Sequence, residues 1–156
     1  MISVFGSEVG ADERRALQAC LDDQWLGMGA RTRAFEQRFA KRLGLERFLM
    51  LDCGSNALYL AVKLLDLPPG SEVIVPTFTW VACAQAVVLA GHRPVFCDVD
   101  LETQNATADT VAPHLGPKTA AIMVVHYAGK PADLTPILEL GLPVIEDAAH
   151  AVDSAK

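Results

Sequence analysis

Residues 72–100 read EVIVPTFTWVACAQAVVLAGHRPVFCDVD, and this stretch decides the fold class. Two short apolar runs, Val73–Val75 and Pro94–Phe96, flank a helix-sized apolar segment, Val81–Ala90, which Gly91 ends. Strands that are apolar on both sides, separated by a helix, are typical of a parallel sheet whose two faces are covered. The stretch therefore predicts an α/β fold.

The same alternation continues on both sides of this stretch. The remaining strand candidates are Phe48–Leu51, Ala121–Val125 and Pro143–Ile145, and the remaining helical segments are Leu58–Leu65, Asp109–Leu115 and Leu134–Leu140. Together they make five strand candidates separated by helix-sized connections. This order predicts a mainly parallel sheet flanked by helices.

The first part of the chain has a different pattern. Apolar residues recur every three or four positions over Asp12–Leu21 and Arg31–Leu43, which predicts two amphipathic helices. Such a pair is too small to bury a core of its own. We therefore expect residues 1–44 to form an N-terminal helical arm and residues 45–156 to form the sheet domain.

Composition excludes several classes of protein. The 156 residues are 51% hydrophobic and 21% charged, which is globular composition, and the net charge of −6 offers no positive field for nucleic acid or anionic lipid. No secretory signal and no membrane-length apolar segment is visible, so we expect a cytoplasmic protein. The cysteines are far apart in apolar surroundings, which predicts reduced, mostly packing thiols and no zinc site; they are Cys20, Cys53, Cys83 and Cys97.

Ligands of open α/β sheets bind at the carboxyl ends of the strands. Gly54, Ser55 and Asn56 follow the first strand candidate and precede a helix, where free backbone N–H groups favour an anion such as phosphate. Simple N-capping by the serine is the alternative. Neither a Gly-x-Gly-x-x-Gly nor a P-loop motif occurs in the sequence, so dinucleotide and P-loop sites are not expected.

Four further residues near strand ends could bind a ligand. Trp80 could stack on a planar ligand or pack in the core, and His126 and His150 could donate to a ligand or be satisfied within the fold. No third ligand stands at metal-binding spacing from these histidines, so no metal is expected. Asp147 follows an apolar strand, where a carboxylate needs a positive partner: an arginine, a helix N-terminus or a ligand.

Read together, these segments resemble the DegT/DnrJ/EryC1/StrS family of sugar aminotransferases, which depend on pyridoxal phosphate and have the fold of aspartate aminotransferase (fold type I). The similar segments occur in family order along almost the whole chain: residues 25–29 (WLGMG), 35–40 (FEQRFA), 54–58 (GSNAL), 69–82 (PGSEVIVPTFTWVA), 94–100 (PVFCDVD), 125–126 (VH), 129–133 (GKPAD) and 144–150 (VIEDAAH). By this resemblance, residues 45–156 are part of the large, cofactor-binding domain.

The resemblance implies a cofactor site. Asp147 matches the residue that pairs with the protonated pyridine nitrogen of pyridoxal 5′-phosphate, and Trp80 matches the aromatic residue that stacks on its ring. Gly54, Ser55 and Asn56 match the turn that binds the phosphate. The last candidate, His150, stands where the family has Gln or His close to the ring.

The resemblance also implies a reaction. The family moves an amino group from glutamate or glutamine to a ketone on a nucleotide-linked sugar, or on a cyclitol. Its members are usually homodimers with the active site at the subunit interface, and residues 25–29 are expected near that site. Two alternatives stay open: a dehydratase of the same family, in which histidine replaces the cofactor lysine, and a non-catalytic fragment that binds the cofactor.

One expected residue of the family has no match in the sequence. The lysine that forms a Schiff base with the cofactor stands well beyond the position of Asp147 in the family, and Lys156 is too close to Asp147 to be its equivalent. We therefore predict that this chain is the front part of a longer enzyme, that it holds no catalytic lysine, and that it is inactive alone.

Overall fold

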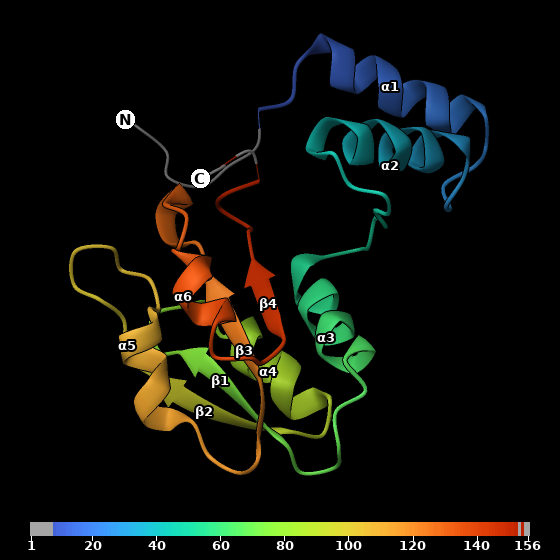
Figure 1. The fold of residues 1–156 in the computed structure, drawn as a ribbon. Helices are drawn as coiled ribbons and strands as arrows, with labels where there is room; N and C mark the ends of the chain where they lie inside the picture. Colours follow the sequence, from blue (N-terminus) through green and yellow to red (C-terminus); the bar gives the residue numbers. More distant parts are fainter. Residues whose placement is uncertain (1–7, 153, 155–156) are drawn as a thin grey trace. The chain divides into compact units, whose positions relative to one another are not determined.

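The computed structural model describes residues 8–152 and 154, and it divides the chain into two compact units, residues 1–50 and 51–156 (Figure 1). In the first unit, α1 (Ala11–Asp22) and α2 (Ala30–Leu43) confirm the two predicted amphipathic helices. Acidic residues in the first turn favour the start of α1, and Gly44, with φ of +67°, ends α2 in the left-handed conformation.

Residues 48–51 are not a strand, which corrects the first strand candidate. The side chains of Leu49 and Met50 are 76% and 44% exposed. The backbone N–H of Met50 donates to Oε1 of Glu36 at 2.9 Å instead of to a neighbouring strand. An apolar run becomes a strand only when a second strand accepts its hydrogen bonds, and no described residue does so here.

The second unit is built on a four-stranded sheet in the order β2-β1-β3-β4, and every neighbouring pair is parallel. The strands are β1 (Glu72–Pro76), β2 (Arg93–Cys97), β3 (Thr119–Val125) and β4 (Val144–Asp147). The connecting elements are α3 (Gly54–Leu64), α4 (Ala82–Leu89), α5 (Ala108–Val111), η1 (Ala112–His114), η2 (Tyr127–Gly129) and α6 (Leu134–Leu138). The predicted α/β class with a parallel sheet is confirmed.

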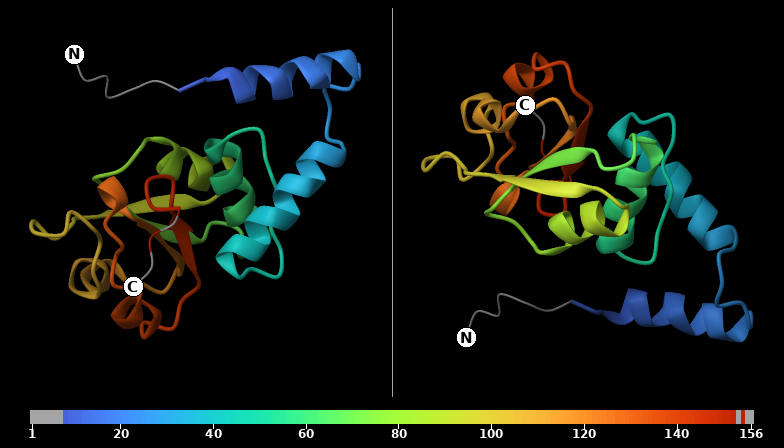
Figure 2. Two further views of the ribbon diagram at one scale, coloured as in Figure 1. Left: turned by 90° about the horizontal axis from the view of Figure 1, so that it is seen from above. Right: turned by 90° about the horizontal axis from the view of Figure 1, so that it is seen from below.

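The sheet buries side chains on both of its faces, and helices lie on its two sides (Figure 2). Alternate residues of each strand point to opposite sides, so that Val73 and Val75 pack in one core cluster with Val62 of α3. Ile74 points to the other side, where it packs in a second cluster with Ile137 of α6. Helices α3 and α4 therefore cover one face, and α5 and α6 cover the other.

All four strands end at the same edge of the sheet. The register places Pro76 of β1 beside Cys97 of β2, and Val125 of β3 beside Asp147 of β4. The side chains that follow these residues are thereby gathered at this carboxyl edge. In the described part of the chain, no helix is long and apolar enough to cross a membrane.

Candidate functional site

Asp147 is the last residue of β4 and lies at the carboxyl edge. Its carbonyl oxygen accepts a hydrogen bond from the backbone N–H of His126, 3.1 Å away, which extends the β3–β4 pairing by one residue. The side chain is half-buried. Oδ2 accepts from Sγ of Cys83 at 3.2 Å, and Oδ1 accepts from the backbone N–H of Ala149 at 3.0 Å.

No basic side chain among the described residues neutralises this carboxylate. Among residues 8–152 and 154, no arginine, lysine or histidine forms an ion pair with Asp147. The sequence left open a structural arginine as its partner, and no arginine of the described residues takes that role. Desolvation of a charge without a counter-ion is unfavourable, so Asp147 retains the capacity to bind a cationic group.

Cys83 lies on the first turn of α4 and is fully buried. Burial raises the pKa of its thiol to about 12; the hydrogen bond with Thr79, 3.0 Å away, opposes this effect, and Asp147 adds to it. The thiol is therefore protonated at neutral pH and donates to Asp147. Burial likewise raises the pKa of Cys97 to about 11. The packing interpretation does not hold for Cys53, which is exposed.

The start of α3 is open to an anion. Its N-cap is Cys53, which makes no side-chain capping bond, and Ser55 lies inside the first turn, so the N-capping alternative for the serine is wrong. In the described part of the chain, the backbone N–H groups of Gly54, Ser55 and Asn56 have no partner. A Cβ added at Gly54 would meet no atom within 4 Å.

One acid lies beside this helix start. The side-chain amide of Asn56 donates to both carboxylate oxygens of Asp52, at 2.9 and 2.8 Å. This hydrogen bond is the main reason that the pKa of Asp52 is lowered from its ordinary value. The amide side chain of Asn56 is thus occupied, whereas its backbone N–H remains available. Helix α3 also contacts β4, the strand that carries Asp147.

Trp80 does not pack in the core. It follows β1 and precedes α4, and its side chain is 74% exposed, which leaves a flat aromatic face available to a ligand. Nearby at the same edge, the rings of Phe78 and Tyr127 lie 4.1 Å apart, and Tyr127 meets His150 edge-on at 6.0 Å. The loops after β1, β3 and β4 thus bring aromatic side chains together.

The two histidines differ in how they are satisfied. His126 is buried, and its Nδ1 accepts from the backbone N–H of Ala132 at 3.0 Å, so Nε2 carries the proton that it donates to Glu146 at 3.0 Å. His150 is exposed, and its Nδ1 accepts from the backbone N–H of Ala128 at 3.3 Å. The Nε2–H of His150 is left free to donate, whereas His126 is a satisfied structural residue.

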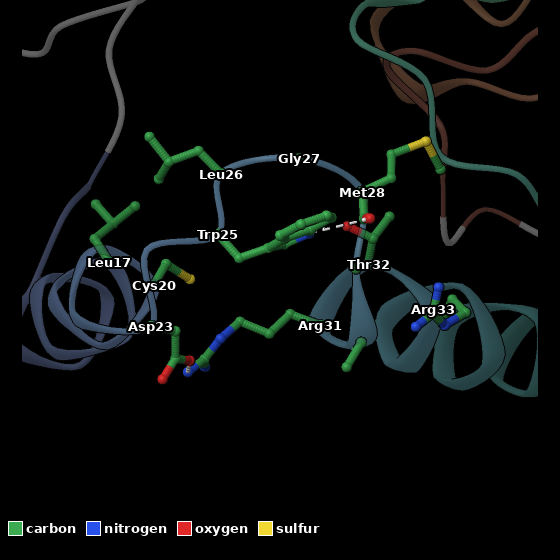
Figure 3. Close-up of a pocket in the computed structure, with 12 residues that line it drawn as sticks. Leu17, Cys20, Asp23, Trp25, Leu26, Gly27, Met28, Arg31, Thr32 and Arg33 are labelled. Carbon is green, nitrogen blue, oxygen red and sulfur yellow. Dashed lines mark hydrogen bonds and ion pairs between the residues drawn. The ribbon is translucent and has the colours of Figure 1, made fainter.

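A cavity lies in the first unit, where the turn between α1 and α2 lines about 750 Å³ (Figure 3). The indole N–H of Trp25 donates to the carbonyl of Met28 at 3.2 Å, and a Cβ at Gly29 would come within 2.8 Å of that indole nitrogen. Arg31 and Asp23 form an ion pair of 3.2 Å in its wall. None of the six predicted cofactor residues lines this cavity, so the candidate site is placed at the carboxyl edge.

The sequence did not predict two features of that edge. Cys83 was interpreted as a packing residue, because a buried cysteine carries no signal for the acceptor it meets. The pairing of His126 with Glu146 joins residues from two different strands, which only the register reveals. No group of three metal-binding side chains occurs among the described residues.

Comparison with known proteins gives consistent matches. The model of the DegT/DnrJ/EryC1/StrS aminotransferase family matches residues 7–156. The dTDP-4-dehydro-2,3,6-trideoxy-D-glucose 4-aminotransferase of Saccharopolyspora spinosa is 43% identical over 161 residues, covering 99% of this chain and 42% of that protein. The solved aminotransferase TlmJ from Streptoalloteichus hindustanus is 45% identical with a TM-score of 0.90, covering 97% of this chain and 43% of TlmJ.

A dehydratase also matches. The E. coli GDP-4-keto-6-deoxy-D-mannose-3-dehydratase, solved with bound hydrated PLP, is 28% identical with a TM-score of 0.83, over 91% of this chain and 39% of that enzyme. The chain thus spans less than half the length of these relatives.

Proposed function

We propose, because this chain belongs to the DegT/DnrJ/EryC1/StrS aminotransferase family, that it forms part of an enzyme that moves an amino group from glutamate or glutamine to a nucleotide-linked keto sugar. Pyridoxal phosphate is the cofactor. The single observation that carries the proposal is the half-buried Asp147 carboxylate, which no basic side chain of the described residues neutralises. The pyridinium nitrogen of the cofactor is the cation that fits it.

The residues present fit the chemical groups of this cofactor. Bound pyridoxal phosphate supplies an electron-withdrawing ring that stabilises negative charge on the carbon from which a proton leaves. Asp147 holds a proton on the ring nitrogen, because an adjacent carboxylate favours the charged form of the ring. The free N–H groups of Gly54, Ser55 and Asn56 bind the phosphate at the positive end of α3.

Two side chains complete the proposed site. Trp80 offers its exposed face to the ring, which orients the ring and excludes water from one side of it. His150 offers its Nε2–H as a donor, because Ala128 already occupies Nδ1. Each role comes from this chain's own hydrogen bonds and exposure together with the family resemblance.

The proposed substrate class follows from the name of the Saccharopolyspora spinosa relative. Its name specifies a dTDP-linked 4-keto deoxy sugar, so we propose a substrate of that kind. We also propose that the enzyme is a homodimer, as the resemblance implies, and that it is cytoplasmic. A second copy would cover apolar side chains that the first unit exposes: Leu17, Leu21, Trp25, Leu26 and Met28.

The test is an amino-transfer assay. The purified longer enzyme that contains this chain is incubated with pyridoxal phosphate, L-glutamate and a dTDP-linked 4-keto deoxy sugar, and 2-oxoglutarate and the sugar product are measured by mass spectrometry. Equal amounts of 2-oxoglutarate and amino sugar are expected. Turnover of the sugar without use of glutamate would contradict the aminotransferase.

The second candidate is a sugar dehydratase, which the match to the E. coli 3-dehydratase favours. The same assay separates the two activities, because a dehydratase removes water from the sugar and leaves no nitrogen in it. A protein that binds the cofactor and changes neither substrate would instead be the non-catalytic alternative.

A further inference from the structure

We propose that Cys83 is a positioning residue for Asp147: its thiol holds the carboxylate in place without neutralising the charge that the cofactor ring requires. This inference rests on the proposed function and deepens it, because it adds a residue that acts through Asp147. The thiol is fully buried on α4, and its Sγ lies 3.2 Å from Oδ2 of Asp147 and 3.0 Å from Oγ1 of Thr79.

The carboxylate is fixed from two sides. Cys83 holds Oδ2 from α4, and the backbone N–H of Ala149 holds Oδ1 from the segment that follows β4. Each oxygen of a carboxylate can accept two hydrogen bonds. One acceptor position therefore remains on each oxygen, which is what a pyridinium N–H needs.

The choice of donor matters because it sets the charge of the pair. A lysine or arginine in place of Cys83 would form a salt bridge with Asp147 and compete with the cationic ring. A thiol is a weak neutral donor, and with a pKa of about 12 it stays neutral at physiological pH. The pair therefore keeps the full negative charge of the carboxylate.

Other titratable groups near Asp147 do not share this role. Glu146 precedes Asp147 in β4, and its side chain accepts a hydrogen bond from the ring of His126. The backbone N–H of His126 donates to the carbonyl oxygen of Asp147 and not to its carboxylate. The Nδ1 of His150 accepts from Ala128. In the described part of the chain, none of these three side chains hydrogen-bonds the Asp147 carboxylate, which leaves Cys83 as its side-chain donor.

The first test needs no cofactor. In a background with Cys20→Ser, Cys53→Ser and Cys97→Ala, the remaining thiol is titrated by its ultraviolet thiolate absorbance after rapid pH jumps. Asp147→Asn removes a negative charge and a charged acceptor, both of which raise the pKa of Cys83, so this pKa is expected to be lower than in the same background with Asp147 intact. Glu139→Gln, an exposed acid at the end of α6, is the matched control and is expected to leave it unchanged.

The second test measures the affinity for pyridoxal phosphate by equilibrium dialysis. Cys83→Ala is expected to bind about fivefold more weakly, which is the loss of one hydrogen bond. Cys83→Ser keeps a donor and is expected to bind like the unmodified chain. Cys97→Ala removes a buried thiol from the opposite core cluster, and it is expected to have no effect.

The outcomes separate the two proposals. An affinity of Cys83→Ala equal to that of the unmodified chain, or a Cys83 pKa that Asp147→Asn leaves unchanged, would overturn the inference alone. If neither the unmodified chain nor the longer enzyme that contains it binds pyridoxal phosphate, the proposed function fails and the role of Cys83 fails with it. A lower thiol pKa in Asp147→Asn, together with rescue of binding by serine, supports the inference.

Discussion

At the scale of single residues, the fold places a half-buried carboxylate where no basic side chain of the described residues pairs with it. Asp147 is half-buried, and its carboxylate accepts hydrogen bonds from one thiol and one backbone N–H. Neutral donors stabilise a carboxylate less than a counter-ion does, so part of the desolvation cost remains. Binding of a cationic ring would recover that cost, which connects the local chemistry to the proposed cofactor.

The two buried thiols are expected to make folding stability depend on pH in the alkaline range. Burial raises the pKa of Cys83 from 9.0 to about 12 and that of Cys97 from 9.0 to about 11. Between pH 9.0 and these raised pKa values, the unfolded chain loses thiol protons that the folded chain keeps. Folding stability is therefore expected to fall as the pH rises above 9. Urea unfolding from pH 8 to 10.5 measures this slope.

Alanine at either buried position should make that alkaline slope shallower. Cys53→Ala changes an exposed thiol and serves as the control, because it should leave the slope as it is. An equal slope in the Cys83→Ala and Cys53→Ala variants would contradict the prediction.

Gly129 is required for two separate reasons. Its φ is +83°, and a Cβ there would lie 3.1 Å from the carbonyl oxygen of His150. Gly91 is a matched control, since its φ is +91° but a Cβ would meet nothing within 4 Å. We expect Gly91→Ala to lose about 1 kcal/mol of unfolding free energy from backbone strain, and Gly129→Ala to lose more. Equal losses in chemical denaturation would show that the contact with His150 has no cost.

At the scale of secondary structure, the sequence predicted the elements whose pattern is local. The strands at 73–75, 94–96, 121–125 and 143–145 and all six helical segments are found, with ends shifted by a few residues. The candidate at 48–51 failed because pairing is not local: nothing in an apolar run says whether another strand will accept its hydrogen bonds. The cofactor roles of the individual residues came from family resemblance and remain proposals.

Helix α3 also begins earlier than its apolar pattern indicated. Periodicity predicted a start at Leu58, whereas the helix begins at Gly54. Its first turn is exposed and contains small or polar residues, so it carries no apolar signal. That missed turn holds the free N–H groups on which the proposed phosphate site depends.

A negative charge added at the start of α3 is expected to have opposite effects on folding stability and on cofactor affinity. Ser55→Asp places a negative charge in the first turn, which should stabilise the helix by about 0.5 kcal/mol through its dipole. The same charge repels phosphate, so affinity for pyridoxal phosphate should fall. Thermal unfolding and a binding titration measure the two effects. Ser55→Ala is the control, and tighter binding by the aspartate variant would contradict a phosphate site at this helix.

At the scale of the whole molecule, the sheet with the proposed site and the cavity described above belong to different units of the chain. Residues 51–156 contain the sheet, both core clusters and the six proposed cofactor residues. Residues 1–50 contain a cavity of about 750 Å³ and a turn with exposed Trp25. The proposed site can therefore be tested by changes in the second unit, with Trp25 as the only other tryptophan to remove from fluorescence measurements.

The central claim is that Asp147 binds the cationic ring of pyridoxal phosphate, and a fluorescence titration tests it most directly. In a Trp25→Phe background, Trp80 is the only tryptophan, and a saturable loss of its emission reports cofactor binding. Asp147→Asn is expected to weaken binding by about tenfold or more, because it removes a charged hydrogen bond. Glu139→Gln, the matched surface control, should bind like the parent. Equal affinities for these two variants would contradict the account.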